Sequence, residues 1–189
     1  MKIGLFVAVI ILGLVIWGVS RVLVGESRLT ITRQEPHFPE VSGFNLMREE
    51  FVFPQDFQGE YNLLLIPFQQ RQQQDVNTWI PAARELERTT PGLVYYELPT
   101  IYQLPTLSRT FINEGMRAGI PDQTARERTI TLYLDKSGFK TALGITTEER
   151  IHIFLVDRQG TILWQEEGLY SAEKIQSLVE LLEDLQGHS

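Results

Sequence analysis

The residues best suited to chemistry lie together in a short polar segment. Residues 69–75 read Gln-Gln-Arg-Gln-Gln-Gln-Asp and directly follow an apolar run at residues 63–68. If a helix begins here, its free backbone N–H groups and its dipole could receive an anion or the carbonyl oxygen of a partner. The residues that we predict to make such contacts are Gln69, Gln70, Arg71, Gln73 and Gln74. The alternative is an exposed loop without a function of its own.

Thiol chemistry is excluded by composition, because none of the 189 residues is cysteine. Glutamine offers no thiolate and no redox couple in its place. His37, His152 and His188 are far apart and lack metal-ligand spacing, so we predict neither a metal nor another cofactor. His152 lies in an apolar stretch, which favours a structural role.

A second group of candidates surrounds the turn-rich segment 115–122. It consists of Arg109, Arg117, Arg126 and Arg128. These side chains could hold an acidic partner through bidentate hydrogen bonds. The alternative is a solvated face with salt bridges to Asp122 and Glu127. Tyr102, between two prolines, is the aromatic residue that we expect to contact a partner.

The N-terminus differs in kind from the rest of the chain. Residues 3–20 carry no charge, and a helix of that length nearly spans a bilayer core. We predict a transmembrane anchor at residues 1–24, a linker at 25–42 and a folded domain at 43–186. A cleaved signal peptide is the alternative. We expect a single-pass protein with its N-terminus in the cytoplasm and its domain outside, although the basic residues on both flanks do not decide the orientation.

Charge narrows the choice of partners. Lys2 is the one charged residue of 1–20, so the remaining chain carries 16 basic and 24 acidic side chains. This excess of negative charge disfavours nucleic acids and anionic lipid surfaces. The partner class that remains is a protein, and we expect one that is associated with the membrane.

Hydrophobic patterns predict alternating strands and helices, hence an α/β domain. The continuous apolar run at 63–68 predicts a strand that is buried on both faces. We expect further strands at 93–98, 129–134, 151–156 and 161–165. We expect helices at 76–88, 105–114 and 137–143, and a last helix that begins after Ser171.

Several local motifs resemble the thioredoxin superfamily, in the version shared by peroxiredoxins and membrane-anchored thiol-disulfide oxidoreductases. They are Phe57-Gln-Gly59, Phe68, Pro81, the hairpin sequence at 154–160 and the Gly-x-x-Ser at 168–171. The resemblance implies a thioredoxin-like mixed sheet flanked by helices, over about residues 43–185. It places the two redox cysteines of the family on Gln73 and Val76, and its cis-proline on Ile151 or His152.

The architecture also resembles, more weakly, the assembly-factor family of the mitochondrial ATP synthase. An anchor, a complete fold and a missing dithiol favour a non-enzymatic module that binds proteins or assembles a membrane complex. The alternative is a non-thiol enzyme or small-ligand binder that uses the junction at 69–75. A deep pocket at that junction would favour the alternative.

Overall fold

The computed structural model describes residues 35–187. The chain divides after Gln34, and every described helix and strand belongs to the second unit. The predicted anchor at 1–24 lies outside the described residues. Within the described part, no helix is both long and apolar enough to cross a membrane.

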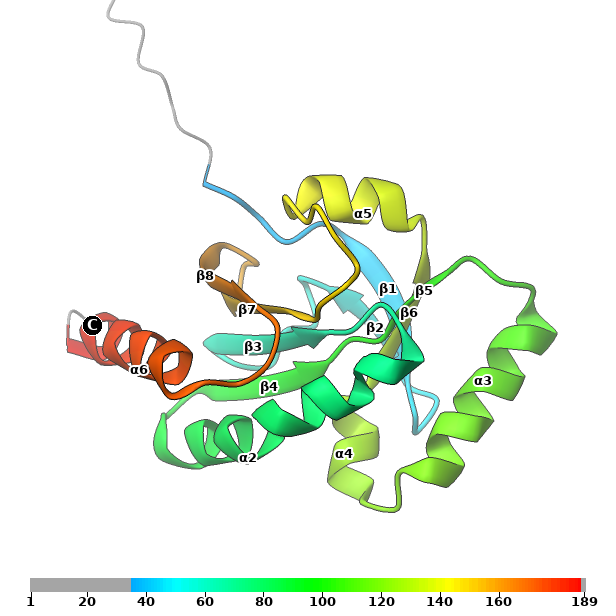
Figure 1. Cartoon of the computed structure of the whole chain (residues 1–189), viewed down its shortest axis with the longest axis horizontal. Coiled ribbons are helices and arrows are strands. Elements are labelled where there is room, and N and C mark those ends of the chain that lie inside the picture. The colour runs from blue at the N-terminus through cyan, green and yellow to red at the C-terminus, as the bar shows by residue number, and fades with distance from the viewer. Residues whose placement is uncertain (1–34, 188–189) are drawn as a thin grey trace, which may run out of the picture. The chain divides into compact units, whose positions relative to one another are not determined.

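The described domain has two four-stranded sheets. The one with more residues in its strands, called the larger sheet, has the strand order β4-β3-β7-β8 (Figure 1). Strand β3 (Tyr61–Ile66) pairs in parallel with β4 (Leu93–Glu97) and antiparallel with β7 (His152–Asp157). Strand β8 (Ile162–Glu167) completes the hairpin with β7. All of β3 is buried, as its apolar run predicted, because a cluster of buried side chains packs on each of its faces.

Helices α2 (Gln73–Thr89) and α6 (Ala172–Gly187) pack on one face of this sheet. Trp79 of α2 is fully buried there, and its Nε1 donates to the carbonyl oxygen of Gly168 at 2.9 Å. Its ring meets that of Trp164 edge to face at 6.5 Å. The buried residues on the opposite face of this sheet form a separate cluster. Phe139 of helix α5 (Lys136–Ala142) belongs to it.

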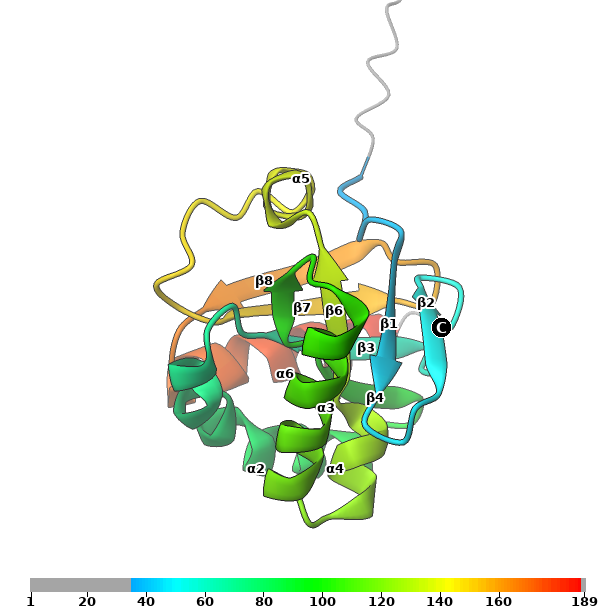
Figure 2. The same cartoon turned by 90° about the vertical axis from the view of Figure 1, so that its right-hand side faces the viewer.

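The smaller sheet has the order β2-β1-β6-β5. Its strands are β1 (Val41–Asn45), β2 (Glu50–Phe53), β5 (Thr100–Tyr102) and β6 (Ile130–Leu134). A bridge between Glu97 and Thr129 links it to the edge of the larger sheet. Helices α3 (Thr106–Gly119) and α4 (Gln123–Arg128) connect β5 to β6, and α3 stands in front of this sheet in Figure 2.

Part of the predicted linker belongs to the domain instead. Phe38 is 3% exposed and lies in the core, and its backbone N–H donates to the carbonyl oxygen of Gly160. His37 forms a bridge with Thr161, and β1 begins at Val41. The prolines around Phe38 suggested a linker, but this segment is an edge that pairs with the β7–β8 hairpin.

Candidate functional site

A polar junction connects the end of β3 to the start of α2. The chain leaves β3 through Pro67 and Phe68, makes a 3-10 turn at Gln70–Gln72 (η1), and enters α2 at Gln73. Gln72 is 2% exposed, and its Oε1 accepts hydrogen bonds from the backbone N–H groups of Phe68 at 2.7 Å and Gln69 at 3.1 Å. Gln72 therefore satisfies two donors that the turn would otherwise bury without partners.

The same glutamines hold the loop that precedes β7. The side-chain nitrogens of Gln69 and Gln72 both donate to the backbone carbonyl of Glu148, at 2.9 and 2.7 Å. We call these two side chains and that carbonyl the glutamine clasp. The clasp joins segments that lie more than seventy residues apart in the chain.

Arg71 adds a contact at the surface of the clasp. Its Nε donates to Gln69 Oε1 at 2.7 Å, and its guanidinium lies 3.1 Å from Glu149 Oε2. The side chains of Arg71 and Glu149 are 65% and 75% exposed, so this ion pair contributes little to stability.

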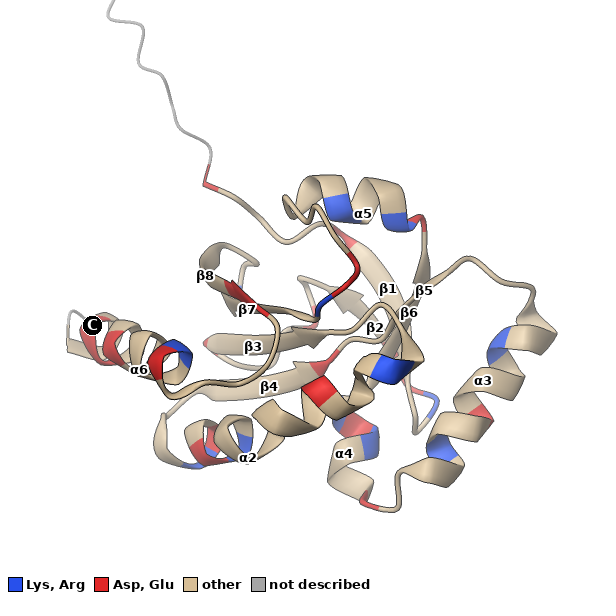
Figure 3. Ribbon diagram, in the orientation of Figure 1, with Lys and Arg blue, Asp and Glu red and all other residues tan. Residues whose placement is uncertain are grey.

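A buried lysine holds the side chain of Glu148. Lys136 Nζ lies 2.6 Å from Glu148 Oε2, and Lys140 Nζ lies 2.9 Å from the other carboxylate oxygen. Lys136 also sits 4.3 Å from the ring centre of Tyr102. Figure 3 marks the basic positions of α5 and the acidic positions of the loop before β7, which these ion pairs bring together. Burial acts to raise the pKa of Glu148, but the two lysines together hold it below its ordinary value.

The positions expected for the redox pair have different surroundings. Gln73 Nε2 lies 3.3 Å from Glu97 Oε2 and 3.2 Å from Asn77 Oδ1. Glu97 is 5% exposed, and burial raises its pKa, against the opposing effects of the Gln73 hydrogen bond and the Arg84 charge. Val76 is fully buried in the core between α2 and the sheet. A side chain at the second position would therefore meet core residues rather than solvent.

The other predicted junction residues lie at its rim. Gln70 and Gln74 are exposed, and Tyr102 is 61% exposed. His152 is buried, and its Nε2 lies 2.9 Å from the carbonyl oxygen of Thr147, which fits the structural role expected of it. Ile151, a candidate for the cis-proline position, is fully buried just before β7.

The arginines around 115–122 make contacts within the domain. Arg126 donates from Nε to the carbonyl of Ile120 at 2.6 Å and from a terminal nitrogen to that of Arg117 at 3.1 Å. Arg109 Nε donates to the carbonyl of Leu104 at 2.6 Å. These hydrogen bonds hold the chain on either side of α3.

The salt bridges of this region differ from those expected. Arg128 pairs with Glu87 at 2.8 Å, and Asp122 pairs with Arg84 at 2.8 Å. Glu127 accepts a hydrogen bond from Gln123. The partners come from α2, which could not be recognised from the neighbouring sequence.

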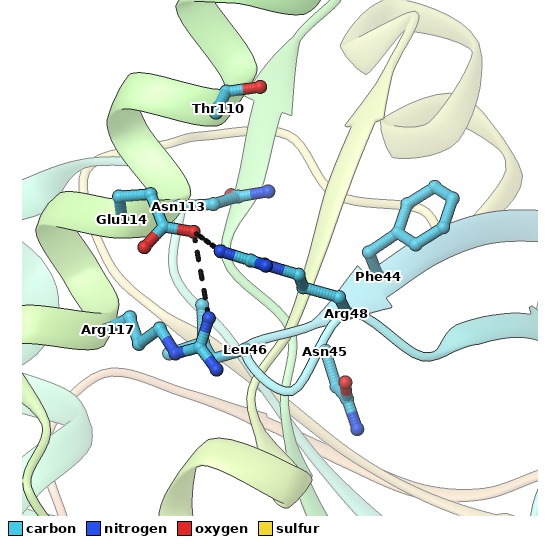
Figure 4. A pocket seen from close by; sticks show the side chains of 8 residues that line it. All are labelled: Phe44, Asn45, Leu46, Arg48, Thr110, Asn113, Glu114 and Arg117. Atoms are coloured by element: carbon cyan, nitrogen blue, oxygen red, sulfur yellow. Dashed lines mark hydrogen bonds and ion pairs between the residues drawn. The ribbon is translucent and has the colours of Figure 1, made fainter.

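A cavity of about 140 Å³ lies between α3 and β1. Figure 4 shows Glu114 between two arginines at this cavity, 2.8 Å from Arg48 and 3.7 Å from Arg117. The hydrogen bond from Arg48 lowers the pKa of Glu114. Both arginines therefore share one carboxylate as their acidic partner, and neither lies at the cavity without one.

Helix α3 has no buried residue. Its contacts with the small sheet include a hydrogen bond from the Tyr133 hydroxyl to Asn113 Oδ1 at 2.8 Å and the guanidinium of Arg109 over the Tyr133 ring at 5.2 Å. Burial of this hydroxyl raises the pKa of Tyr133 to about 12. On the outside, Leu107 and Phe111 are 87% and 83% exposed.

Sequence reasoning found part of the junction and missed its centre. It named Gln69 and Arg71, which are hydrogen-bonded to each other, and Tyr102, whose ring lies over Lys136. It did not name Gln72, Lys136 or Glu148, which make the buried contacts. The one signal in the sequence is the place of Lys136, a charged residue two positions after the predicted strand at 129–134.

No protein-family model and no curated protein matches the chain. Solved structures do match. A thiol:disulfide interchange protein from Bacteroides sp. is 16% identical, with 79% of this chain and 90% of that chain covered and a TM-score of 0.52. The thioredoxin domain of a thiol-disulfide oxidoreductase from Bacteroides vulgatus is also 16% identical, with 78% and 96% covered and a TM-score of 0.51.

A third similar structure is a member of the Sco family of cytochrome c oxidase assembly proteins. It is 11% identical, with 79% of this chain and 95% of that chain covered and a TM-score of 0.50. At these identities the similarity defines the fold alone. The domain therefore has a thioredoxin-like fold, as predicted, in a chain without cysteine.

Proposed function

We propose that this chain is a membrane-tethered, non-redox thioredoxin-like module that binds a protein, as an adaptor or assembly factor of a membrane complex. The observation that carries the proposal is the glutamine clasp beside Gln73 and Val76, where the resemblance places a dithiol. An amide hydrogen bond has no oxidised form. Neither disulfide exchange nor thiol-based peroxide reduction can run through it.

The exposed rim of the junction offers a binding surface. Tyr102 is 61% exposed to solvent, and the ammonium group of Lys136 contacts its ring and helps to hold it in place. Tyrosine is enriched at protein interfaces, where a rigid ring with a polar tip loses little conformational entropy. Gln70 and Gln74 add exposed hydrogen-bonding groups at the start of α2.

Two further observations support an assembly role at a membrane. The uncharged residues 3–20 have the length of a membrane span, which favours a tether with the domain outside the cytoplasm. The similar Sco-family structure belongs to a family of assembly proteins, so the fold is compatible with such work. The negative charge of the domain favours a protein over a nucleic acid as partner.

The alternative is a small-ligand site or a non-thiol enzyme at the junction. Such a site needs polar groups that are free to meet a ligand. Here the side-chain nitrogens of Gln69 and Gln72 and the Oε1 of Gln72 already have partners in the domain. A ligand would have to break the clasp, and for this reason we favour the binding module.

Site-specific photo-crosslinking of the full-length chain in its native membranes tests the proposal. A photoreactive amino acid at position 102 or 74 is expected to crosslink the same membrane protein, identified by mass spectrometry. The same group at Gln176, on the exposed side of α6, is the matched control. Replacement of Tyr102 by alanine should remove the crosslink from position 74.

Crosslinks no stronger than those from position 176 would count against a partner at the junction. Arg117→Ala, tested in the same assay, shows whether the arginines around residues 115–122 contribute to the same contact as the junction. If no partner is found at either surface, Arg71→Ala and Gln73→Ala examine the small-ligand alternative. Unchanged phenotypes in both variants would exclude it.

A further inference from the structure

One face of α3 forms an apolar stripe that nothing in the described domain covers. Leu107, Phe111, Gly115 and Ala118 follow one another at intervals of four, four and three residues, so they lie along one side of the helix. We call these four residues the α3 stripe. Leu107 and Phe111 are 87% and 83% exposed, and Gly115 and Ala118 are exposed too. Figures 1 and 2 agree that α3 is the outermost element on its side of the small sheet.

The structure of a single copy does not require a glycine at position 115. Glycine inside a helix is less favourable than alanine, because it loses more backbone freedom on folding. A Cβ atom added at Gly115 would meet nothing within 4 Å. There is therefore room for a side chain at this position in one copy. A neighbouring helix packed closely against α3 would require a residue as small as glycine here.

We propose that two copies of this chain associate through the α3 stripe, with their α3 helices antiparallel about a two-fold axis near residue 113. The stripe is large in its N-terminal half and small in its C-terminal half. In the antiparallel pair Leu107 of each copy faces Ala118 of the other, and Phe111 faces Gly115. Every large side chain thus meets a small one, as an interface made twice from the same surface requires.

A parallel arrangement would not pack in this way. It would place Phe111 against Phe111 and leave an unfilled space between the two Gly115 residues. In the antiparallel orientation the stripe is complementary in size to itself, so a second copy supplies the matching surface. The order of residue sizes therefore favours a second copy as the occupant.

Electrostatics do not oppose this contact. No member of the stripe is charged, and the neighbouring Glu114 is already paired with Arg48 at 2.8 Å and Arg117 at 3.7 Å. The interface thus forms without burying an unpaired charge.

The size of the stripe indicates how the dimer must be held. At roughly 200 Å² for a buried aromatic side chain, two phenylalanines and two leucines stay below the ~1,200 Å² typical of stable complexes. The contact is then weak in dilute solution. Residues 3–20, if they lie in a membrane, confine two copies to one plane and raise their effective concentration. Only this increase in effective concentration depends on the membrane tether of the proposed function.

Cysteine crosslinking suits this chain because it has no cysteine of its own. Full-length Leu107→Cys and Ala118→Cys copies, carrying different tags, are produced together in one membrane and mildly oxidised. The antiparallel pair brings these two cysteines together. Two copies with the same substitution hold their cysteines about eleven residues, or roughly 16 Å, apart along the helices. Leu107→Cys with Gln176→Cys is the matched control pair.

We expect the mixed pair to crosslink about tenfold more than either same-site pair or the control pair, because only it juxtaposes the thiols. Phe111→Ser should reduce this crosslink about tenfold, through the apolar surface lost from both copies. Gly115→Leu should reduce it similarly without lowering the melting temperature, since its side chain has room in the single copy and leucine favours a helix more than glycine does. Circular dichroism of both variants checks the fold.

Three results would overturn the dimer. They are equal crosslinking of same-site and mixed pairs, no crosslink in membrane-bound protein, and a mixed-pair crosslink that survives both Phe111→Ser and Gly115→Leu. Protein found in the soluble fraction overturns the tether instead. The mixed-pair crosslink is then measured with concentrated protein in solution, where its absence refutes the dimer by itself.

Discussion

The start of α2 and the helix α3 differ in which residues they bury and which they expose. At the start of α2, Gln72 is 2% exposed, and Lys136 beside it is 4% exposed. In α3 no residue is buried, and Leu107 and Phe111 point to solvent. Polar residues are therefore buried at the junction after β3, whereas apolar residues are exposed along α3. Residue type alone therefore does not locate a functional surface in this domain.

The largest effect is expected from breaking the clasp with Gln72→Ala. The change leaves the buried N–H groups of Phe68 and Gln69 without their acceptor and removes a donor to Glu148. We expect a loss of about 2–3 kcal/mol in the free energy of unfolding. Urea denaturation measures it. The exposed Gln74→Ala is the control, with a change within about 0.5 kcal/mol; equal effects of both variants would refute a special role for Gln72.

The next effect is expected from Glu148→Gln, which leaves Lys136 without its closest carboxylate. We expect a loss of about 2 kcal/mol at pH 7. The folded-state pKa of Glu148 lies below its ordinary value, so its contribution is complete above about pH 5 and is lost as the pH falls through that pKa. The difference between wild type and variant should therefore shrink in acid. A constant difference from pH 7 to pH 3 would contradict this account.

A smaller effect of opposite sign is expected from Glu97→Gln. Burial raises the pKa of Glu97 in the folded state, so ionised Glu97 costs stability as the pH rises above its ordinary value. We expect the variant to be about 1 kcal/mol more stable at pH 7, with the gain disappearing near pH 4. Thermal unfolding at both pH values measures it. A variant that is less stable at neutral pH would show that the hydrogen bond with Gln73 outweighs burial.

The smallest effect is expected from Phe111→Ser in α3. A side chain that is 83% exposed gives little to the folded domain, so the change in unfolding free energy should stay within about 0.5 kcal/mol. Phe139→Ser in the core is the comparison, where we expect a loss of about 3 kcal/mol or more. Comparable losses would show that α3 is packed more tightly than its exposure indicates.

The central sheet could be predicted because its signals are local. The apolar run of β3 and the hairpin of β7 and β8 are visible in the sequence, and so is the apolar face of α6. The edge at Phe38 was missed, because its burial depends on Gly160, far along the chain. Periodicity predicted a helix at 105–114, but α3 continues through the predicted turn at Gly115 and ends at Gly119. The pattern also gave no information on whether the outer face of this helix has a partner.

The candidate site was predicted less completely than the fold. A run of glutamines has no periodicity that separates the buried Gln72 from the exposed Gln70 and Gln74. The burial of Gln72 is decided by the carbonyl of Glu148, which the fold brings to it. Such long-range hydrogen bonds leave no local pattern.

The buried indole of Trp79 has a practical consequence. Its hydrogen bond to the carbonyl of Gly168 and its edge contact with Trp164 make its fluorescence sensitive to the docking of α2 against the end of β8. Trp164 in turn donates from Nε1 to Ser177 Oγ of α6 at 3.1 Å. The domain therefore carries two natural optical probes, one for each helix that covers this face of the large sheet, and loosening of either helix can be followed without a dye.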